Sequence, residues 1–472
     1  MNFINGVEAK IADLKEKYSL KCTIPSLKVG NKSAQTGIVQ GGMGVGISLS
    51  GLASAVANEG CVGVIAANAI GMIEPDYFHN HIEANVRALR KEIKKSREAG
   101  NGLIGVNIMV AVDCFAQLLE TAIEEKVDAL FLGAGLPIKN IPVEKIRAAG
   151  VAVFPIVSSG RAARLIFKSW EKMYKDIPDG VVVEGPQAGG HLGFKYDQIN
   201  SESCKLEVIV PEVVEALLEF QGRFGKEIPV IAAGGIFSGE DIYRFFKLGA
   251  KGVQMGTRFV ATHECDADIR FKDAYVKAKE EDVTIISSPV GLPGRAINNR
   301  FLKEVLQGMK KNFRCPSKCL ESCGAKDAQY CISEALDNAR KGDLDNGFAF
   351  AGSNVHKVGS ITSVKELIST LRNEYTIAAF YDMLKTEYDK MADKLAAKKE
   401  EYSTVLSTFS SEVQESLRKT TLENEIKFKQ KMESMSEFIE QTKSEYNAML
   451  NKFYQLSEDI AILNSGKFNL SN

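Results

Sequence analysis

Eight short apolar runs, separated by amphipathic helical stretches, constrain the fold of this 472-residue chain most strongly. Each run is apolar at consecutive positions, as parallel strands are when helices cover both faces of their sheet. Eight such units in succession predict an α/β fold of the (β/α)8 TIM-barrel type, with a doubly wound open sheet as the competing arrangement. The predicted strands cover residues 36–43, 61–68, 102–110, 127–135, 151–159, 181–185, 230–235 and 252–259.

The last hundred residues differ in composition from the rest of the chain. All twelve prolines lie at or before Pro316, and Gly466 is the only glycine after Gly359. We assign residues 1–372 to the barrel and 373–472 to a long α-helical, coiled-coil extension. Apolar residues recur there at steps of three and four, which is a heptad pattern. Two long helices are expected, paired as a hairpin or between subunits, so the chain is predicted to be a homo-oligomer or to hold a partner. The two seams are Ile377, Phe380, Leu384, Tyr388, Met391 and Leu395, and Phe428, Met432, Met435, Ile439, Thr442, Tyr446, Met449, Phe453 and Leu456.

Composition narrows the class of protein. The formal net charge is −1, so no global field favours nucleic acid or an anionic membrane. No apolar run approaches the roughly 20 residues that span a bilayer, and the first 20 residues do not form a signal peptide. A cytoplasmic location, with a small molecule as the expected ligand, is the simplest interpretation. The nine cysteines are then thiols or metal ligands.

The ends of the predicted strands carry glycine and small polar residues. In a barrel these carboxyl ends form the mouth where chemistry occurs. They hold Gly42 and Met43, Asn68, Asn107, Gly133, Ser158, Glu184, Gly235 and Gly256. Such a rim is suited to a flat ligand with polar edges.

Three glycine-rich turns stand out among these ends. "QGGMGVG", which contains Gly44, lacks the third glycine and the acidic residue of a dinucleotide fingerprint, so we interpret it as a backbone approach to a planar cofactor. "AAGGIFSGED" and "GVQMGTRF" close the last two units, where backbone amides bind phosphate in many barrels. Ser238 is the predicted N-cap of the helix that follows, and Thr257 adds a hydroxyl.

The stretch "VVVEGPQAGGHLG" places His191 among Gly189, Gly190 and Gly193, where its ring is not covered by neighbouring side chains. An imidazole at the mouth of a barrel is suited to moving protons near neutral pH. His191 is therefore the candidate catalytic residue.

These motifs, together with "KAKEEDVTIISSPVGLPGRAINN", resemble the nitronate monooxygenase family, also called 2-nitropropane dioxygenases, over residues 24–370. Flavin-type enoyl-acyl-carrier-protein reductases share its superfamily. The resemblance implies a (β/α)8 barrel that binds FMN without a covalent bond, and a reaction of alkyl nitronates with O2. It implies that Asn68, Glu184, Gly189 and Gly235 contact FMN, that Gln254, Met255, Gly256 and Thr257 hold its phosphate end, and that His191 is the active-site histidine.

We include in the predicted cofactor site the other residues of the strand ends and glycine turns. For a neutral nitroalkane, His191 is expected to remove the proton from the carbon beside the nitro group. The additional cofactor residues are Gly42, Met43, Gly44, Asn107, Gly133, Gly190 and Gly234.

Glu184 departs from the family pattern, because many nitronate monooxygenases carry Gln there and the reductases tend to carry Glu. The alternative reaction is therefore reduction of an enoyl thioester with NAD(P)H as co-substrate. A third hypothesis makes the barrel a scaffold that binds partners through its coiled coil. In both enzymatic hypotheses the flavin performs the redox step.

Four cysteines lie close together in "CPSKCLESCGAKDAQYC", within an insertion near residues 300–331. Thiols at this density indicate zinc or an iron–sulfur cluster, although the spacing matches neither the common zinc nor the ferredoxin pattern. Three of them would also share one face of a helix, where cysteine packs as a small apolar residue. The candidate ligands are Cys315, Cys319, Cys323 and Cys331.

Overall fold

The fold is described by a computed structural model for residues 22–315, 323, 328–417 and 422–470. Eight parallel strands form a closed barrel in the order β10-β11-β3-β4-β5-β6-β7-β8, which confirms the predicted barrel and excludes the open sheet. The strands are β3 (Ile38–Gln40), β4 (Val62–Ala66), β5 (Leu103–Met109), β6 (Ala129–Gly133), β7 (Ala152–Val157), β8 (Val181–Glu184), β10 (Val230–Ala233) and β11 (Gly252–Met255).

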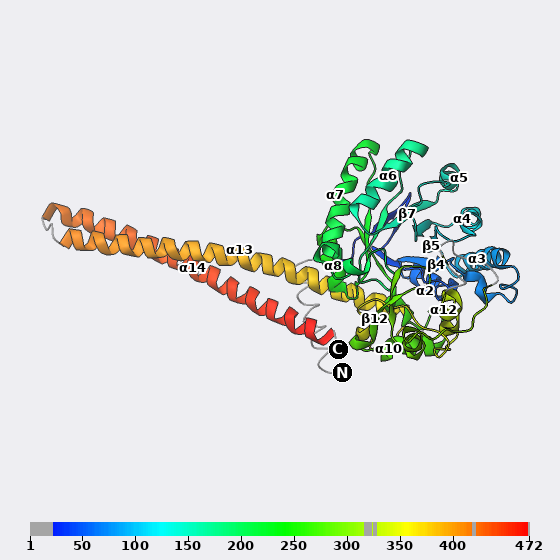
Figure 1. Ribbon diagram of the computed structural model, residues 1–472. Helices are drawn as coiled ribbons and strands as arrows, with labels where there is room; N and C mark the ends of the chain where they lie inside the picture. The colour runs from blue at the N-terminus through cyan, green and yellow to red at the C-terminus, as the bar shows by residue number, and fades with distance from the viewer. Residues whose placement is uncertain (1–21, 316–322, 324–327, 418–421, 471–472) are drawn as a thin grey trace. The chain divides into compact units, whose positions relative to one another are not determined.

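Helices follow the barrel strands and lie outside them, as Figure 1 shows for α3 to α7. Their apolar stripes cover the outer face of the barrel, so the strands are buried on both sides. The helices are α2 (Ser50–Asn58), α3 (His81–Glu98), α4 (Phe115–Glu124), α5 (Val143–Ala148), α6 (Gly160–Tyr174), α7 (Leu206–Phe224), α8 (Gly239–Lys247), α9 (Thr257–Val260) and α10 (Ile269–Lys277). Short 3-10 helices cover Ile70–Ile73, Tyr196–Gln198, Glu202–Cys204, Glu280–Asp282 and Val355–Lys357.

The predicted strand at 252–259 is too long. The strand ends at Met255, and α9 begins at Thr257 with Gly256 as its N-cap residue. The apolar residues Phe259 and Val260 are buried in this helix and not in the sheet. A short apolar run fits a buried helix as well as a strand, which is why the sequence pattern could not place this boundary.

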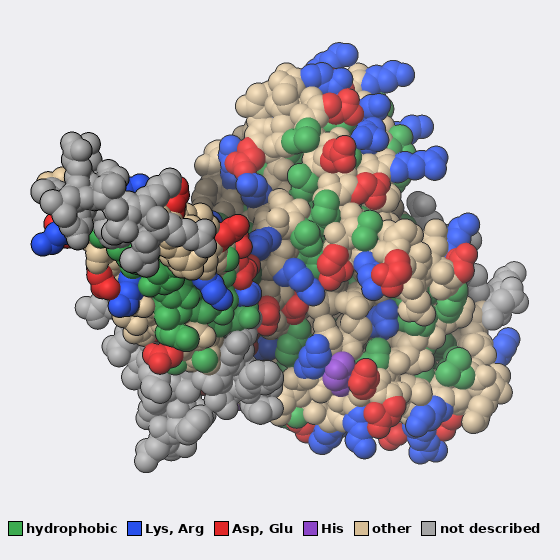
Figure 2. Space-filling model, turned by 90° about the vertical axis from the view of Figure 1, so that its left-hand side faces the viewer, with side chains coloured by type: hydrophobic (Ala, Val, Ile, Leu, Met, Phe, Trp, Pro, Cys, Tyr) green, Lys and Arg blue, Asp and Glu red, His purple; other side chains and the backbone are tan. Residues whose placement is uncertain are grey.

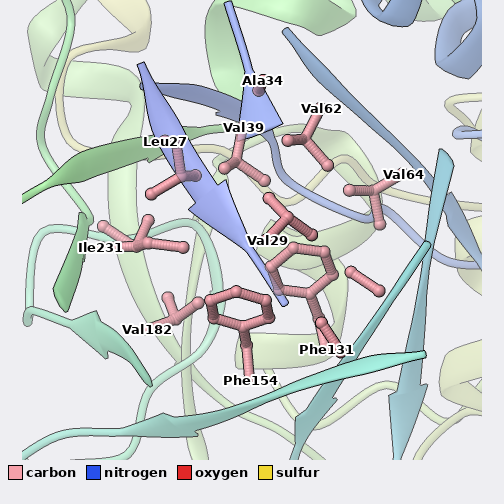
Figure 3. Close-up of a cluster of buried hydrophobic side chains, with 13 residues drawn as sticks. Leu27, Val29, Ala34, Val39, Val62, Val64, Phe131, Phe154, Val182 and Ile231 are labelled. Carbon is pink, nitrogen blue, oxygen red and sulfur yellow. The ribbon is translucent and has the colours of Figure 1, made fainter. Parts of the chain in front are cut away.

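A β-hairpin closes the amino-terminal end of the barrel. It consists of β1 (Leu27–Val29) and β2 (Lys32–Ala34), which pair antiparallel. Its apolar side chains pack among the first inward-facing residues of the strands, with Val29 directed towards Phe131 (Figure 3). Phe131 stacks on Phe154 with ring centroids 5.3 Å apart. Because this end is filled, the carboxyl end of the barrel is the one available for a ligand.

A second, three-stranded sheet involves the turn that follows β8. It has the order β12-β13-β9, from β9 (Gly190–His191), β12 (Val283–Ser287) and β13 (Pro293–Ile297). All its pairs are antiparallel. Helices α11 (Arg300–Leu306) and α12 (Ile332–Arg340) come next in the chain. This sheet fixes the backbone around the candidate histidine.

The chain divides into two compact units, residues 24–373 and residues 1–23 with 374–472, of which 22–23 are the described part of the amino-terminal segment. The second unit contains most of α13 (Val364–Leu417) and all of α14 (Leu422–Leu470), which run side by side (Figure 1). Tyr388 stacks on Phe453 at 4.3 Å, Lys398 Nζ lies 2.6 Å from Glu445 Oε2, and Lys431 Nζ lies 2.9 Å from Glu412 Oε2. The two helices therefore pair antiparallel within one chain, as a hairpin.

The seam of this hairpin is the one that the heptad pattern predicts. Leu384 and Leu456 are buried in one cluster with Ile377 and Phe380. Thr442, a polar member of the predicted seam, is also buried, and its hydroxyl donates to the backbone oxygen of Phe438 at 2.8 Å. The side chain of Phe428 lies outside the described ones. The apolar residues of the seam are therefore buried between the two helices of one chain. Assembly with another chain stays a prediction.

The face of the molecule in Figure 2 carries both positive and negative side chains. Figure 2 shows lysine, arginine, aspartate and glutamate side chains interspersed on the face it displays, in keeping with the formal net charge of −1. In the part of the chain that the structure describes, no helix combines the length and the apolar character that crossing a bilayer requires.

Candidate active site

The turn after β3 packs against the ends of the next two strands. A Cβ atom on Gly42 would lie 2.5 Å from Asn107 Cβ, and one on Gly44 would lie 3.2 Å from the backbone oxygen of Asn68. A side chain on Gly42 would collide with Asn107, whereas one on Gly44 would be tight against Asn68 and would need a small shift of its neighbour. The turn thereby brings Met43, Asn68 and Asn107 to one part of the barrel mouth.

A buried glutamine that the sequence analysis did not select holds this turn. Gln40 Oε1 accepts from the backbone amide of Val64 at 2.9 Å, and Gln40 Nε2 donates to Ser48 Oγ at 3.1 Å. Ser48 Oγ in turn accepts from the backbone amide of Met43 at 3.0 Å. Buried polar networks of this kind are rigid when every member is satisfied.

The ends of β10 and β11 carry the second group of glycines. Gly234 and Gly235 have φ of +95° and +82°, a conformation that glycine adopts without strain. A Cβ on Gly235 would also lie 2.1 Å from Gln187 Oε1. Gly256 differs, because its φ is −111° and the nearest atom to a Cβ there is Met43 Sδ at 3.8 Å. The space beside Gly256 is therefore open to a ligand.

Ser238 caps α8 as predicted, since its hydroxyl accepts from the amide of Asp241 at 3.1 Å. The Asp241 carboxylate accepts from the amides of Phe237 and Ser238, each at 3.0 Å. These two amides are occupied by protein, so the donors left for an anion are those nearer to the end of β10.

A segment that the sequence analysis missed, residues 350–354, joins these strand ends. Gly352 N donates to Thr257 Oγ1 at 3.0 Å, and Asn354 Nδ2 donates to the backbone oxygen of Gly235 at 2.6 Å. Ser353 N donates to the backbone oxygen of Gln187 at 3.1 Å. That contact uses the backbone amide of Ser353, so its hydroxyl remains available to a ligand. The short motif "AGSN" is the signal that could have revealed the segment.

Glu184 ends β8 and pairs in register with Ala233 of β10. Burial raises the pKa of the Glu184 carboxyl to about 7, because the charged form loses its contact with water. Near neutral pH this side chain therefore exchanges between a hydrogen-bond donor and an anion, whereas glutamine at the same place would remain neutral.

His191 lies in β9, directly after the glycine turn. Its Nε2 atom is 2.8 Å from Ser288 Oγ, and its ring meets that of Phe350 edge to face, with centroids 5.1 Å apart. Burial lowers the pKa of His191 to about 4, so the imidazole is neutral at pH 7. Ser288 and Phe350 are 97 and 159 residues further along the chain, and sequence reasoning did not select either of them.

Arg295 fixes the turn between β8 and β9. Its Nη2 and Nε atoms donate to the backbone oxygens of Pro186 at 2.7 Å and Ala188 at 3.2 Å. Gly189 fits tightly there, since a Cβ on it would lie 2.5 Å from the backbone of Ala351. The glycine turn is thus rigid on the side that faces the protein.

Most of the barrel unit matches a known protein family. The profile of the family described as Nitronate monooxygenase matches residues 26–374. The chain belongs to the nitronate monooxygenase family. It is an FMN-dependent oxidoreductase of that family, which argues against the alternative of a barrel that acts only as a scaffold.

The chain is similar in sequence to curated relatives and in fold to solved structures. A protein of Bacillus subtilis described as a probable nitronate monooxygenase is 27% identical, over 71% of this chain and 95% of its own length. The structure of FabK from Thermotoga maritima is 29% identical, covering 72% of this chain and 92% of that one, with a TM-score of 0.56. A nitroalkane oxidase from Streptomyces ansochromogenes is 22% identical and has a TM-score of 0.56, covering 72% of this chain and 96% of that one, which shows a shared fold.

The family's FMN fits the residues at the ends of β10 and β11. Among the described residues, none accepts a hydrogen bond from the amide of Gly235 or of Gly256. The hydroxyl of Ser353 is buried, and within the described chain it has no hydrogen-bond partner. A phosphate offers several acceptor oxygens and would satisfy these donors beside the open space at Gly256.

For the remaining predicted cofactor residues, the structure gives their burial and their immediate surroundings. Gly133 ends β6 and is buried, and a Cβ on it would lie 3.0 Å from Ile156 Cδ1. Met255 is buried too, so its backbone is the part that the mouth can use. Gly190 has φ of +84° with no atom within 4 Å of a Cβ position, and Gln254 is partly exposed.

The cysteine cluster remains a prediction. Cys319 lies outside the described residues, and Cys315 is exposed while Cys323 and Cys331 are partly buried. In the described ranges, no three His, Cys, Asp or Glu side chains are arranged so that they could hold a metal ion. Neither the metal site nor the packing interpretation is tested.

Proposed function

We propose that this protein oxidises alkyl nitronates with O2, using FMN bound at the carboxyl ends of the barrel strands. FMN, when bound, would supply the redox chemistry that oxidation of a nitronate by O2 requires. The amides of Gly235 and Gly256, with the hydroxyls of Thr257 and Ser353, would hold its phosphate. Asn68, Asn107 and Glu184 would meet its polar edges, with the turn at Gly42–Gly44 and the turn at Gly189–Gly190 against it.

The observation that carries the proposal is the position of His191, which directly follows the glycine turn at the mouth and is held there by Ser288 and Phe350. Ser288 and Phe350 hold the His191 ring, and its second nitrogen has no partner among the described residues. An uncharged imidazole presents either a donor or an acceptor to a substrate without the desolvation cost of a buried cation. A nitronate, whose nitro oxygens carry the negative charge, is a substrate that such a group can orient.

A second candidate is the NAD(P)H-dependent reduction of an enoyl thioester. Glu184 favours it, because the reductases of the superfamily tend to carry Glu where many nitronate monooxygenases carry Gln. The 29% identity with FabK from Thermotoga maritima gives it further weight. The cofactor would be the same, so only the substrate distinguishes the two proposals.

The deciding experiment uses the purified, flavin-loaded protein under anaerobic conditions. We expect the flavin absorbance to be bleached on addition of an alkyl nitronate and to return when O2 is admitted. Bleaching by NADPH, with recovery that requires an enoyl thioester, would establish the second candidate. Absence of flavin after reconstitution with FMN would contradict both.

The proposal also assigns separate roles to the two parts of the chain. We assign flavin binding to the barrel, residues 1–372, and a role outside the chemistry to residues 373–472. The supporting observation is that every residue named for the flavin site lies before Asn373, while the hairpin buries its own apolar seam. A function of the hairpin in assembly or in holding a partner remains an expectation.

Glu184 gives a pH-dependent prediction. Its pKa is about 7 in the folded protein and near 4.5 in the unfolded chain, so the unfolded state loses its proton first. In flavin-free protein the wild type should therefore lose stability relative to Glu184→Gln as the pH rises from about 4.5 to 7, and the difference should level off above pH 7. Thermal denaturation of both proteins across this range measures it. A difference that does not change with pH would show that the folded protein leaves the pKa of Glu184 near its ordinary value.

A further inference from the structure

The ring of His191 is held by three separate segments of the chain. Its backbone pairs with Gly294 in β13, so the direction of the side chain is set by the second sheet. Phe350 contacts the ring edge to face, with 64° between the planes. Ser288, just after β12, places its hydroxyl 2.8 Å from Nε2. A ring fixed in this way has one nitrogen, Nδ1, that has no hydrogen-bond partner among the described residues.

The Ser288 hydroxyl has one proton to donate, and its contacts decide where that proton goes. Ser288 Oγ accepts from the backbone amide of Val290 at 3.4 Å. The backbone turn is fixed by the bonds from Ser288 N to Leu292 O at 3.0 Å and from Gly291 N to Ser288 O at 2.9 Å. Among the described residues, His191 Nε2 is the remaining partner of this buried hydroxyl. A hydroxyl oxygen can accept two hydrogen bonds, so the bond from Val290 alone leaves both directions open at His191. Donation to His191 Nε2 is the arrangement that gives the buried hydroxyl proton an acceptor among the described residues.

A neutral imidazole carries one proton, so a ring that accepts at Nε2 must carry it on Nδ1. We infer that Ser288 is a positioning residue that fixes the tautomer of His191 with Nδ1 protonated, so that His191 donates a hydrogen bond to the substrate. The inference rests on the proposed function for the identity of the substrate, an alkyl nitronate. It replaces the expected role of His191 as the base for a neutral nitroalkane.

The chemistry of the substrate agrees with this assignment. A nitronate has already lost the proton on carbon and presents negatively charged nitro oxygens, which accept hydrogen bonds. Donors held in place beside such oxygens stabilise charge without reorganisation. A base would instead need a lone pair on Nδ1, and burial makes this ring a weak base, since the pKa of His191 falls to about 4.

The test is the position of the proton in the flavin-loaded enzyme. Protein labelled with ¹⁵N-histidine is examined by NMR near pH 7, and the His191 signals are assigned by their loss in His191→Asn. We expect Nδ1 to be protonated in the wild type and in Ser288→Thr, which keeps the hydroxyl. In Ser288→Ala the proton should move to Nε2, the nitrogen that free imidazole side chains favour.

Two results would overturn the inference: a wild-type ring protonated on Nε2, or the same tautomer in wild type and Ser288→Ala. The other four histidines and the flavin content report whether each variant is folded. This readout needs no substrate, so it is independent of the proposed function. If no nitronate is oxidised, the substrate is wrong while the tautomer can still be as inferred.

Discussion

Replacing His191 with alanine is expected to lower kcat for an alkyl nitronate by about 10²–10³, the effect of losing one preorganised donor to a charged oxygen. The loss should appear with the anionic nitronate itself, because the donor acts on the nitro oxygens. Steady-state rates with the preformed nitronate and with the neutral nitroalkane, on enzyme of equal flavin content, measure it.

Two amides serve as matched controls for this position. The side-chain amide of Asn lies near the place of Nδ1, and that of Gln lies near the place of Nε2. His191→Asn should therefore retain more nitronate turnover than His191→Gln or His191→Ala. A loss confined to the neutral nitroalkane, by about 10²–10⁴, would instead identify His191 as the general base. Full activity in all three variants, with flavin bound, would leave His191 without a catalytic role.

Replacing Gly256 with leucine is expected to weaken FMN binding while the protein remains folded. The backbone there has an ordinary φ of −111°, and the nearest atom to a Cβ position is Met43 Sδ at 3.8 Å. The side chain would occupy space that we assign to the cofactor. An overpacking cost of about 1–3 kcal/mol corresponds to a Kd higher by roughly 5- to 150-fold. Fluorescence titration of flavin-free protein with FMN gives this Kd directly.

Gly222 supplies the control, because it lies in α7 and has no atom within 4 Å of a Cβ position. Gly222→Leu should bind FMN as the wild type does. Gly235 is a poorer test, since a Cβ on it would collide with Gln187 and would disturb the protein as well as the ligand. If Gly256→Leu binds FMN with wild-type affinity, the space beside Gly256 is not part of the cofactor site.

The apolar runs were sufficient to predict the barrel because their signal is local. A strand buried on both faces must be apolar throughout, and alternation with helices leaves few ways to bury such strands. The same holds for the extension, where the three-and-four spacing of residues such as Leu384 and Leu456 predicted which side chains are buried. In both cases the pattern lies in neighbouring residues of the chain.

The glycines of the mouth were also visible in the sequence, although their separate reasons were not. Gly42 and Gly189 leave no room for a side chain, Gly235 needs a positive φ, and Gly256 leaves open space. The sequence shows the same residue type in all these situations, and only the surrounding atoms in the folded protein distinguish them. The sequence was equally unable to show where β11 ends, because an apolar residue such as Phe259 can be buried in a strand or in a helix.

By itself, the sequence determined the barrel, the order of its units, the position of the glycine turns and the buried face of the long helices. The tertiary structure decided that the helices pair within one chain, and that Ser288, Phe350 and Ser353 join residues of the mouth from far along the chain. It also decided the charge state of the site, because burial moves the pKa of Glu184 up to about 7 and that of His191 down to about 4. Hydrogen-bond partners and burial depend on which distant segments come into contact when the barrel closes. A local sequence pattern does not contain that information.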